Sequence, residues 1–343
     1  MTGVNRFAFE ICKALYRLGA NILVVAPHRI LPSYQTDFPL KKWGILSGPA
    51  WEMTELPVFL RLNHNPLLLS FSGLGPLFYR RQIITIHDLA YLENPAWYSK
   101  TYYRFYKFCT PVIAGNAMKV LTVSNFSGSE INRRLGIEAG KIEVVSNAVD
   151  FTAVRPVKPQ AAVGKKFILS VGSLDPRKNL PVIIDAFRQS GLSGDYELVL
   201  VGKGDKIFRM VSEQKVDANL AGYVTDEELV WLYSNASLFV YPSLFEGFGI
   251  PPLEAMTLNC PVILSDIPVF RELYDGAALF VDPHDPEGIA EAMNRVVSDD
   301  GLRLKLVRDG ALRASEFSWE KSAGVVLDII GKAEEGRRRA DGN

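Results

Sequence analysis

The stretch "FILSVGSLDPRKNLPVIIDAFRQS" (residues 167–190) begins as an apolar run, passes through a polar loop and continues in a helical pattern. The run at 167–171 is short, β-rich and free of charge, which is typical of a strand buried on both faces of a parallel sheet. Pro181 suits the start of the following helix, because its fixed φ is helical and its missing N–H would have no partner there. This strand, loop and helix therefore predict an α/β fold.

The same alternation continues on both sides of this stretch. In the second half it predicts strands at 196–201, 236–241, 261–265 and 278–281, with helices at 181–190, 226–235, 251–258 and 286–298. In the first half it predicts strands at 20–27, 83–88, 119–124 and 142–147, with helices at 6–19 and 127–136. Thr225 and Glu228 have the spacing of a capping box. We therefore expect two doubly wound domains, whose ligands bind at the carboxyl ends of the strands.

The boundary between these domains is expected near residues 150–166, a segment rich in Pro and Lys without periodicity. We predict a first domain over 1–155 and a second over 156–316. A C-terminal helix over 317–343 is predicted to pack back towards the first domain. Its polar end, "EEGRRRADGN" (334–343), is predicted to be frayed.

The net charge of zero conceals an asymmetry between the halves. Residues 1–150 carry 16 of the 38 Lys and Arg and 10 of the 38 Asp and Glu, a net charge of +6. Residues 151–343 carry the other 22 basic and 28 acidic residues, a net charge of −6. The first half is therefore expected to face an anionic partner, unless its charges simply spread over a solvated surface. The segment "YYRFYKFC" (102–109), with Arg104 and Lys107, has the composition of a helix at a membrane interface. A core helix with two solvated cations is the alternative.

Several classes of protein are disfavoured by composition. Three widely spaced Cys and four His exclude a disulfide framework and predict no metal site, which suits a reducing cytoplasm. Neither a membrane-spanning run nor a signal peptide is predicted. No strand is followed by GxGxxG, which argues against a nicotinamide dehydrogenase, and we expect no nucleic-acid partner.

The stretch "FEGFGIPPLE" (245–254) places Glu246 on a loop after a strand and Glu254 in the first turn of a helix that begins at Pro251 or Pro252. Free backbone N–H groups lie between the two carboxylates. Such an arrangement can hold a polyol and a phosphate together.

The loop at 172–181 supplies a second set of candidates. Gly172 allows the tight turn after the strand, and Arg177 and Lys178 place two cations beside a helix start, which predicts a diphosphate site. An ordinary turn with solvated bases is the alternative.

Three further loops carry weaker signals. His87 ends a predicted strand at its carboxyl edge, although a structural histidine is the alternative. Gly3 precedes a helix and could meet a phosphate, or it is part of a plain cap. The backbone at Tyr223 and Val224 could hydrogen-bond a flat heterocycle beside the Tyr ring, with ordinary turn glycines as the alternative.

Together these residues resemble the retaining glycosyltransferases of family 4, over nearly the whole chain. The most specific part is the E-x7-E element of Glu246 and Glu254, and "GSLDPRKNL", "GYVTDEEL", "TIHDLAYLENPAWYS" and "VSNAVD" add to it. The resemblance implies the GT-B fold, in which two Rossmann-like domains face each other across a cleft.

The resemblance also implies roles. Glu254 is similar to the carboxylate that holds the ribose hydroxyls of a nucleotide sugar. Glu246 is similar to the group that holds the donor sugar and its phosphate, together with the backbone N–H groups of Phe248, Gly249 and Ile250.

Further roles fall on both halves. Arg177 and Lys178 match the cations that bind the diphosphate, His87 matches the residue near the reacting sugar, and Gly3 falls at the glycine loop facing the diphosphate. No DxD motif is present, so these cations and a helix N-terminus are expected to replace a metal ion under the leaving diphosphate.

The sequence departs from the family pattern at a few positions. Ser173, Asn5 and Ala148 stand where arginine, glycine and glycine are frequent. The strand that normally precedes the Gly3 loop is missing, so we expect a first sheet that is one strand short, with a partly uncovered apolar face.

The resulting hypothesis is a retaining, metal-independent transfer of a hexose from a nucleotide-diphosphate donor to a polysaccharide, lipopolysaccharide or lipid-linked acceptor. No cofactor is expected, and the location is expected to be cytoplasmic with peripheral membrane contact. A nucleotide-sugar 2-epimerase of the same fold and an inactive nucleotide-sugar-binding remnant are the alternatives.

Overall fold

The computed structural model describes residues 3–28, 37–159, 164–173, 175–202 and 218–341. The chain forms two compact units. The first contains Met1–Asn147 and Ser318–Asn343, and the second contains Ala148–Phe317.

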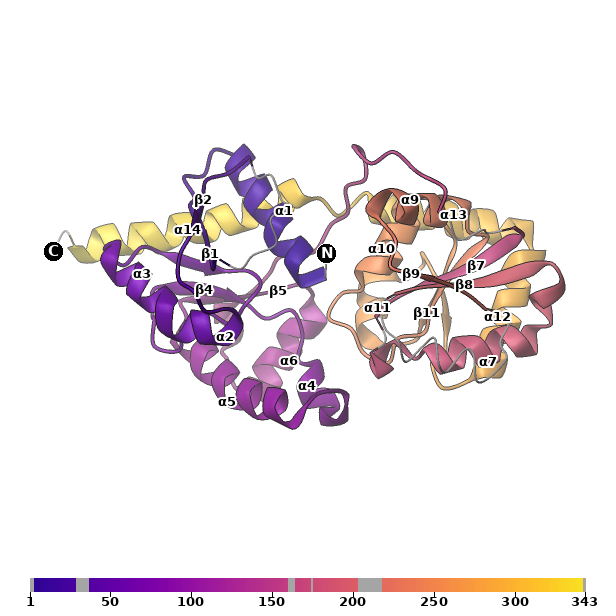
Figure 1. Cartoon of the computed structure of the whole chain (residues 1–343), viewed down its shortest axis with the longest axis horizontal. Helices are drawn as coiled ribbons and strands as arrows, with labels where there is room; N and C mark the ends of the chain where they lie inside the picture. The colour runs from indigo at the N-terminus through magenta and orange to yellow at the C-terminus, as the bar shows by residue number, and fades with distance from the viewer. Residues whose placement is uncertain (1–2, 29–36, 160–163, 174, 203–217, 342–343) are drawn as a thin grey trace. The chain divides into compact units, whose positions relative to one another are not determined.

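The second unit is built on one six-stranded parallel sheet (Figure 1). Its strands are β7 (Lys166–Val171), β8 (Tyr196–Val201), β9 (Ala218–Gly222), β10 (Leu238–Tyr241), β11 (Val262–Ser265) and β12 (Leu279–Val281). The order β12-β11-β10-β7-β8-β9 confirms the doubly wound prediction, and β9 is a strand that the sequence did not predict. The direction of winding reverses between β7 and β10, so a ligand is expected beside their carboxyl ends.

Helices cover both faces of this sheet. They are α7 (Leu180–Ser190), α9 (Asp226–Asn235), α10 (Ile250–Thr257), α11 (Pro268–Tyr274), α12 (Pro286–Ser298) and α13 (Asp300–Ala314), with short turns η4 (Pro176–Lys178) and η5 (Leu192–Gly194). Ile183 and Phe187 of α7 and Met293 of α12 are buried together on one face, and α9 and α10 lie on the other (Figure 1). The capping box is confirmed, since Thr225 Oγ1 accepts from the N–H of Glu228 at 3.2 Å and Glu228 accepts in return.

The chain passes between the units at Asn147 and Ala148 rather than at residues 155 and 156. The segment expected to be a linker is tied to the second unit. Phe151 is buried, and the N–H of Val157 donates to the carbonyl of Glu227 in α9 at 3.1 Å.

The first unit contains two parallel sheets. One joins β1 (Val24–Ala26) to β2 (Leu40–Lys42), and the other has the order β3 (Leu68–Ser70), β4 (Gln82–Thr85), β5 (Lys119–Thr122), β6 (Ile142–Val144). Among the described residues no strand joins β1 to β3, so the strand predicted at 20–27 lies outside the larger sheet. Val25 and Leu68 nevertheless pack against one hydrophobic cluster formed by Trp51, Leu56, Phe59 and Leu60. This packing covers part of the face that was expected to be exposed.

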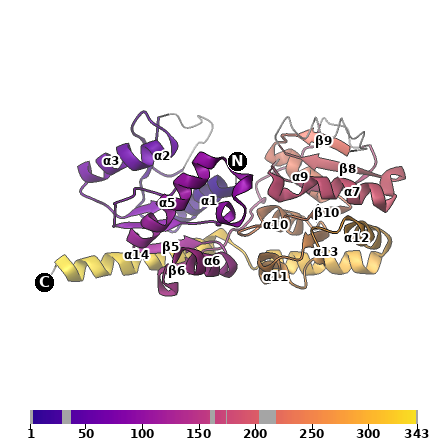
Figure 2. The same cartoon turned by 90° about the horizontal axis from the view of Figure 1, so that it is seen from below.

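The first unit also holds most of the shorter helices. Its helical elements are α1 (Gly3–Arg17), α2 (Gly48–Ala50), η1 (Trp51–Glu55), α3 (Leu56–Leu62), α4 (Ala90–Glu93), η2 (Pro95–Trp97), α5 (Lys100–Asn116), α6 (Asn125–Leu135), η3 (Ala139–Lys141) and α14 (Trp319–Asp341). The C-terminal helix α14 packs against α1, where Phe7 meets Trp319 edge to face at 6.0 Å (Figures 1 and 2). It continues to Asp341 and thus includes most of the tail expected to be frayed, in keeping with the helix propensity of Glu, Arg and Ala.

Candidate active site

The loops after β7 and β10 form a polar cluster at the point where the winding of the second sheet reverses. Arg177 and Lys178 lie on the single turn η4, which Asp175 caps by accepting from the N–H of Arg177 at 3.0 Å. Asn179 ends the turn in the left-handed region, with φ of 56°, and its amide donates to the carbonyl of Pro242 at 3.2 Å. These bonds fix the first loop against the second.

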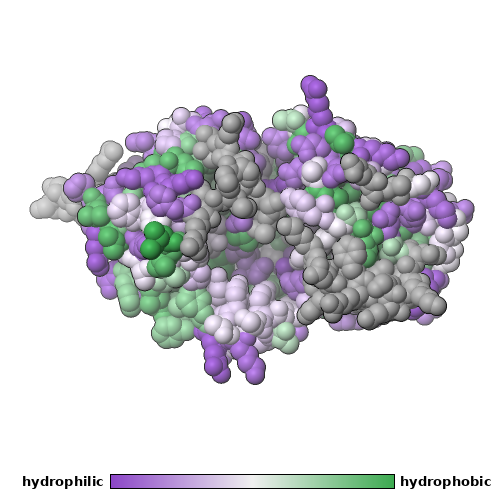
Figure 3. All heavy atoms as spheres, in the orientation of Figure 1, coloured by the Kyte–Doolittle hydropathy of each residue, from purple (hydrophilic) through white to green (hydrophobic). Residues whose placement is uncertain are grey.

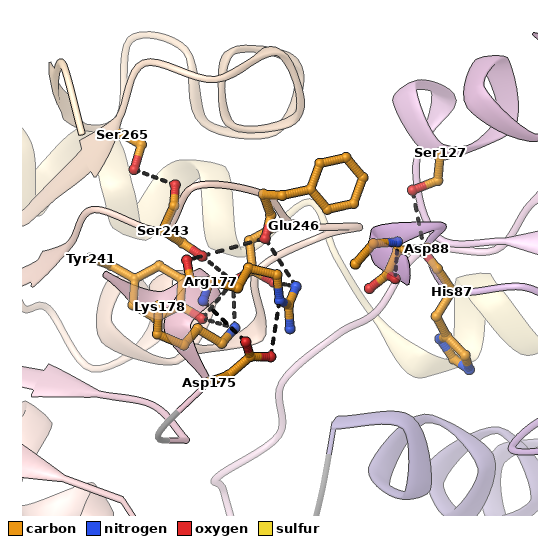
Figure 4. A network of polar contacts seen from close by, with 12 residues as sticks. His87, Asp88, Ser127, Asp175, Arg177, Lys178, Tyr241, Ser243, Glu246 and Ser265 are labelled. Atoms are coloured by element: carbon orange, nitrogen blue, oxygen red, sulfur yellow. Dashed lines mark hydrogen bonds and ion pairs between the residues drawn. The ribbon is translucent and has the colours of Figure 1, made fainter. Parts of the chain in front are cut away.

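Glu246 is the centre of this cluster. Its Oε2 is 3.0 Å from Nη1 of Arg177, and its Oε1 accepts from Nζ of Lys178. The hydroxyl of Tyr241 donates to the same Oε1 at 2.9 Å, and that of Ser243 donates to it at 2.7 Å. The residue is only 6% exposed, and Figure 4 shows these side chains turned towards it. The carboxylate is therefore held by four donors.

The charges of the cluster affect the protonation states of Glu246 and Lys178. Burial alone would raise the pKa of Glu246, but Arg177 and Lys178 lower it to about 2. Burial lowers the pKa of Lys178, and Glu246 opposes that change. Nε of Arg177 also lies 3.4 Å from Oδ2 of Asp175. Two carboxylates thus neutralise the two cations.

Glu254 lies in α10, the helix that follows the loop of Glu246. It is 5% exposed, and its Oε2 accepts from the hydroxyl of Tyr233 at 3.0 Å. The sequence predicted Glu254 in the first turn of this helix. Because α10 begins at Ile250, Glu254 instead lies one residue beyond the first turn. Pro251 stands at the start of the helix as predicted. The role of Glu254 at a ribose remains a prediction.

The backbone before α10 is rigidly fixed. Gly249 has φ of 88°, and a Cβ on it would lie 2.6 Å from the ring of Phe270. Its carbonyl accepts from the hydroxyl of Tyr274 at 2.8 Å, and the buried ring of Phe248 packs against the same residue. These contacts set the direction of the N–H groups of Phe248, Gly249 and Ile250, which were predicted to meet a phosphate.

The remaining candidates of this unit lie at the same edge of the sheet. Gly172 follows β7, and its carbonyl would lie 1.9 Å from a Cβ on Gly202, so the two loops approach closely. Tyr223 and Val224 follow β9, two strands away from β7, and Tyr223 is 65% exposed.

His87 and Gly3 belong to the first unit. His87 follows β4, and its Nε2 lies 2.9 Å from the carbonyl oxygen of Phe71. The ring of Phe7 meets the imidazole edge to face at 5.0 Å, and burial lowers the pKa of His87. Gly3 is exposed at the start of α1.

The sequence did not identify Tyr241 and Ser243 as members of the cluster. Ser265 of β11 extends it, since its hydroxyl donates to the carbonyl of Ser243 at 2.6 Å. A signal was present, because hydroxyl-bearing residues at the end of the apolar run 236–241 fall at the carboxyl edge of the sheet.

Among the described residues, no three His, Cys, Asp or Glu side chains lie together in a way that could hold a metal ion. Over the same part of the chain, no helix has the length and apolar character needed to cross a bilayer.

Comparisons with known proteins match both units. The model of Glycosyltransferase Family 4 matches residues 1–153, and that of Glycosyl transferases group 1 matches residues 154–313. O-antigen chain mannosyltransferase B of Escherichia coli is 31% identical over 275 residues, which are 74% of this chain and 72% of that protein. O-antigen chain mannosyltransferase RfbU of Salmonella typhimurium is 32% identical over 249 residues, which are 70% of this chain and 67% of that protein.

Solved structures agree in fold. Sucrose-phosphate synthase from Thermosynechococcus elongatus superposes with a TM-score of 0.76 at 20% identity, covering 98% of this chain and 94% of that one. Anabaena Alr3699/HepE, solved in complex with UDP and glucose, gives 0.73 at 15% identity and covers 96% of each chain. The chain has two α/β units with parallel sheets and superposes on these glycosyltransferase structures. It therefore has the GT-B fold. The chain belongs to the family 4 glycosyltransferases, and it is a hexosyltransferase.

Proposed function

We propose that this enzyme moves a hexose, mannose in the first instance, from a nucleoside diphosphate donor to a polysaccharide, lipopolysaccharide or lipid-linked acceptor. The proposal includes retention at the anomeric carbon and no metal ion. The observation that carries it is the convergence of Arg177 and Lys178 on Glu246 beside the switch point of the sheet. Mannose is suggested by the mannosyltransferases to which the chain is similar.

The cations supply what the leaving group needs. A nucleoside diphosphate gains negative charge as the glycosidic bond breaks, and fixed donors near that charge lower the barrier. Arg177 and Lys178 are held in place by Asp175 and Glu246, and the amino end of α10 adds oriented N–H groups. These fixed donors can stabilise the charge that develops on the diphosphate without a divalent ion.

The state of Glu246 supports a mechanism in which this residue is neither the base nor a covalent nucleophile. A carboxylate with a pKa of about 2 that already accepts from several donors is a poor base and a poor nucleophile. We therefore assign Glu246 to positioning the donor. The acceptor hydroxyl attacks the anomeric carbon from the face that the phosphate leaves, and the departing phosphate takes the proton of that hydroxyl.

A transfer assay tests this function. Full-length protein is incubated with GDP-mannose or UDP-sugars and octyl α-mannoside, with and without EDTA, and the anomeric proton of the product is read by NMR. We expect an α-linked product, no loss with EDTA, and at least a 100-fold lower rate for Lys178→Ala. Arg188→Ala changes an exposed arginine of α7 as the control. Full activity of Lys178→Ala would refute the proposal.

The identity of the donor nucleotide sugar can be tested by measuring binding. A thermal-shift screen against UDP-, GDP- and ADP-sugars should raise the melting temperature for the true donor, because a ligand that binds only the folded state stabilises it. HepE was solved with UDP, which makes uridine a necessary arm of the screen.

The epimerase alternative receives no support from the relatives named above, which are transferases. An epimerase would change a nucleotide sugar without acceptor. The donor alone, followed by NMR, should remain unchanged over the period in which transfer to octyl α-mannoside is complete.

We further propose that the first unit contacts the cytoplasmic face of an anionic membrane through α5. This helix buries Cys109 and Ile113, while Phe108 is 67% exposed, directly after Lys107 and one turn beyond Arg104. Phe78 is 81% exposed. Figure 3 shows hydrophobic residues at the surface of the unit that holds α3 and α5.

The charge around α5 favours the same partner. Residues 56–129 contain two acidic residues, Asp88 and Glu93, and seven basic ones, namely Arg61, Arg80, Arg81, Lys100, Arg104, Lys107 and Lys119. Arg81 and Lys119 are paired with Glu334 and Glu143, so the excess positive charge rests on the other five. Basic residues near exposed aromatic rings attract anionic lipid, at about 1 kcal/mol for each cation close to the surface.

Cosedimentation with vesicles of 30% phosphatidylglycerol in phosphatidylethanolamine tests this contact. Binding should weaken with salt and should fall about fivefold in Arg104→Ala and further in Phe108→Ser. Leu312→Ser removes a side chain of similar exposure from α13 of the other unit and is the control. Absence of binding at low salt would remove the idea.

A further inference from the structure

The turn η1 (Trp51–Glu55) directs two carboxylates to two different loops. Glu55 accepts from the N–H groups of Ile45 at 3.1 Å and Leu46 at 2.9 Å. Glu52 accepts from the N–H of Gly75 at 3.1 Å, in the loop that follows β3. Each glutamate therefore holds one loop.

The loop at 71–75 is shaped around Glu52. A Cβ on Gly73 would lie 1.9 Å from Oε1 of Glu52, and Gly73 does not have a left-handed φ. A side chain on residue 73 would therefore displace the carboxylate of Glu52. Burial raises the pKa of Glu52, and the backbone N–H groups of Gly75 and Leu74 oppose that change.

The same loop carries the partner of His87. Phe71 is buried, and its carbonyl oxygen lies 2.9 Å from Nε2. A carbonyl only accepts hydrogen bonds, so Nε2 carries the proton of the neutral ring and Nδ1 is the acceptor. No residue that the structure describes is hydrogen-bonded to Nδ1, and the ring of Phe7 packs edge to face against the imidazole at 5.0 Å.

We propose that Glu52 is a positioning residue for His87. By fixing the loop at 71–75, it keeps the carbonyl of Phe71 against Nε2 and so leaves Nδ1 of His87 as the acceptor for a sugar hydroxyl. The last part rests on the proposed function and on the family resemblance, which implies that His87 lies near the reacting sugar. The first part concerns only the loop and the imidazole.

Histidine NMR tests the first part. The chain has four histidines, so long-range ¹H–¹⁵N spectra are simple, and His87→Gln assigns the signal. Wild-type His87 should show the Nε2–H tautomer. Glu52→Ala should shift its ¹⁵N signals towards a mixture of tautomers, and Glu52→Gln, which keeps the volume and one acceptor, should shift them less in the same direction.

Glu55→Ala is the matched control. It changes a glutamate of the same turn, η1, but removes the bonds to Ile45 and Leu46, which belong to the other loop. It should leave the His87 signals unchanged. Wild-type signals in both Glu52 variants, or an equal shift in Glu55→Ala, would overturn the proposal. If Glu52→Ala does not fold by circular dichroism, Glu52→Gln decides the question alone.

Kinetics with GDP-mannose and octyl α-mannoside separate the two parts. Glu52→Ala should lower kcat at least tenfold with little change in the KM for the donor, while Glu55→Ala should behave as wild type. A tautomer shift without loss of kcat would support the positioning and refute the role of His87 at the sugar. Loss of kcat without a tautomer shift would refute the positioning.

Discussion

The replacement Glu246→Gln removes the charge at the centre of the cluster and keeps its shape. The pKa of Glu246 in the folded chain is about 2, against an ordinary value of 4.5. Each pH unit between these values corresponds to about 1.4 kcal/mol, so the ionised side chain stabilises the folded state by about 3 kcal/mol at pH 7. The variant should lose roughly that amount, because it leaves buried Lys178 without its counter-charge, while Arg177 keeps Asp175.

The pH dependence has a definite sign. The folded pKa lies below the unfolded one, so the stabilisation is complete above about pH 4.5 and is lost as the pH falls towards about 2. The difference between wild type and Glu246→Gln should therefore fall from about 3 kcal/mol at pH 7 to about 1.4 kcal/mol at pH 3.

Urea unfolding followed by circular dichroism measures this difference. With a slope of about 2 kcal/mol per M, the midpoint at pH 7 should fall by about 1.5 M. Asp266→Asn is the control, because its pair with Arg271 has the same chemistry at 2.7 Å but both side chains are nearly half exposed. It should cost less than about 1 kcal/mol. An equal cost for the two variants at pH 7, or a difference that does not shrink between pH 5 and pH 3, would refute the reasoning.

Two further changes test the surroundings of the cluster. Gly249→Ala combines a φ of 88° with a Cβ 2.6 Å from Phe270, so it should weaken donor binding at least tenfold in a thermal-shift titration. Gly276→Ala, at a φ of 76° with open space around it, should leave binding unchanged. Tyr233→Phe removes the hydroxyl that donates to Glu254 and should lower stability by about 1–3 kcal/mol in urea unfolding. An unchanged midpoint would show that this bond contributes nothing.

The strands of the second unit were predictable because they are buried on both faces and therefore appear as unbroken apolar runs. β10 (Leu238–Tyr241) and β11 (Val262–Ser265) are fully buried and lie within the predicted ranges. β9 (Ala218–Gly222) was missed because it is a half-buried edge strand of small residues. In the first unit, β2 and β3 have three residues each, too few for a periodicity to be visible.

The candidate residues of the second unit were found for a similar reason. Arg177, Lys178 and Glu246 stand on loops directly after apolar runs, and parallel strands bring such loops to one edge. Their direct pairing was not predictable, because it depends on β7 and β10 being neighbours, which the order of the strands along the chain does not give. Tyr241 was missed although its hydroxyl falls at that edge, because a Tyr at the end of an apolar strand also has the pattern of a core residue.

The pairing of Glu246 with Arg177 and Lys178 gives this carboxylate a second role, in the protonation of the cations. A lysine as buried as Lys178 tends to lose its proton, and the neighbouring charge of Arg177 lowers its pKa further. Glu246 raises it again, so the carboxylate keeps both cations charged and correctly oriented before any donor is present. Donors that need no reorganisation when charge develops are the most effective ones. The glutamate that stabilises the folded unit is thus the same group that prepares its cations for an anionic leaving group.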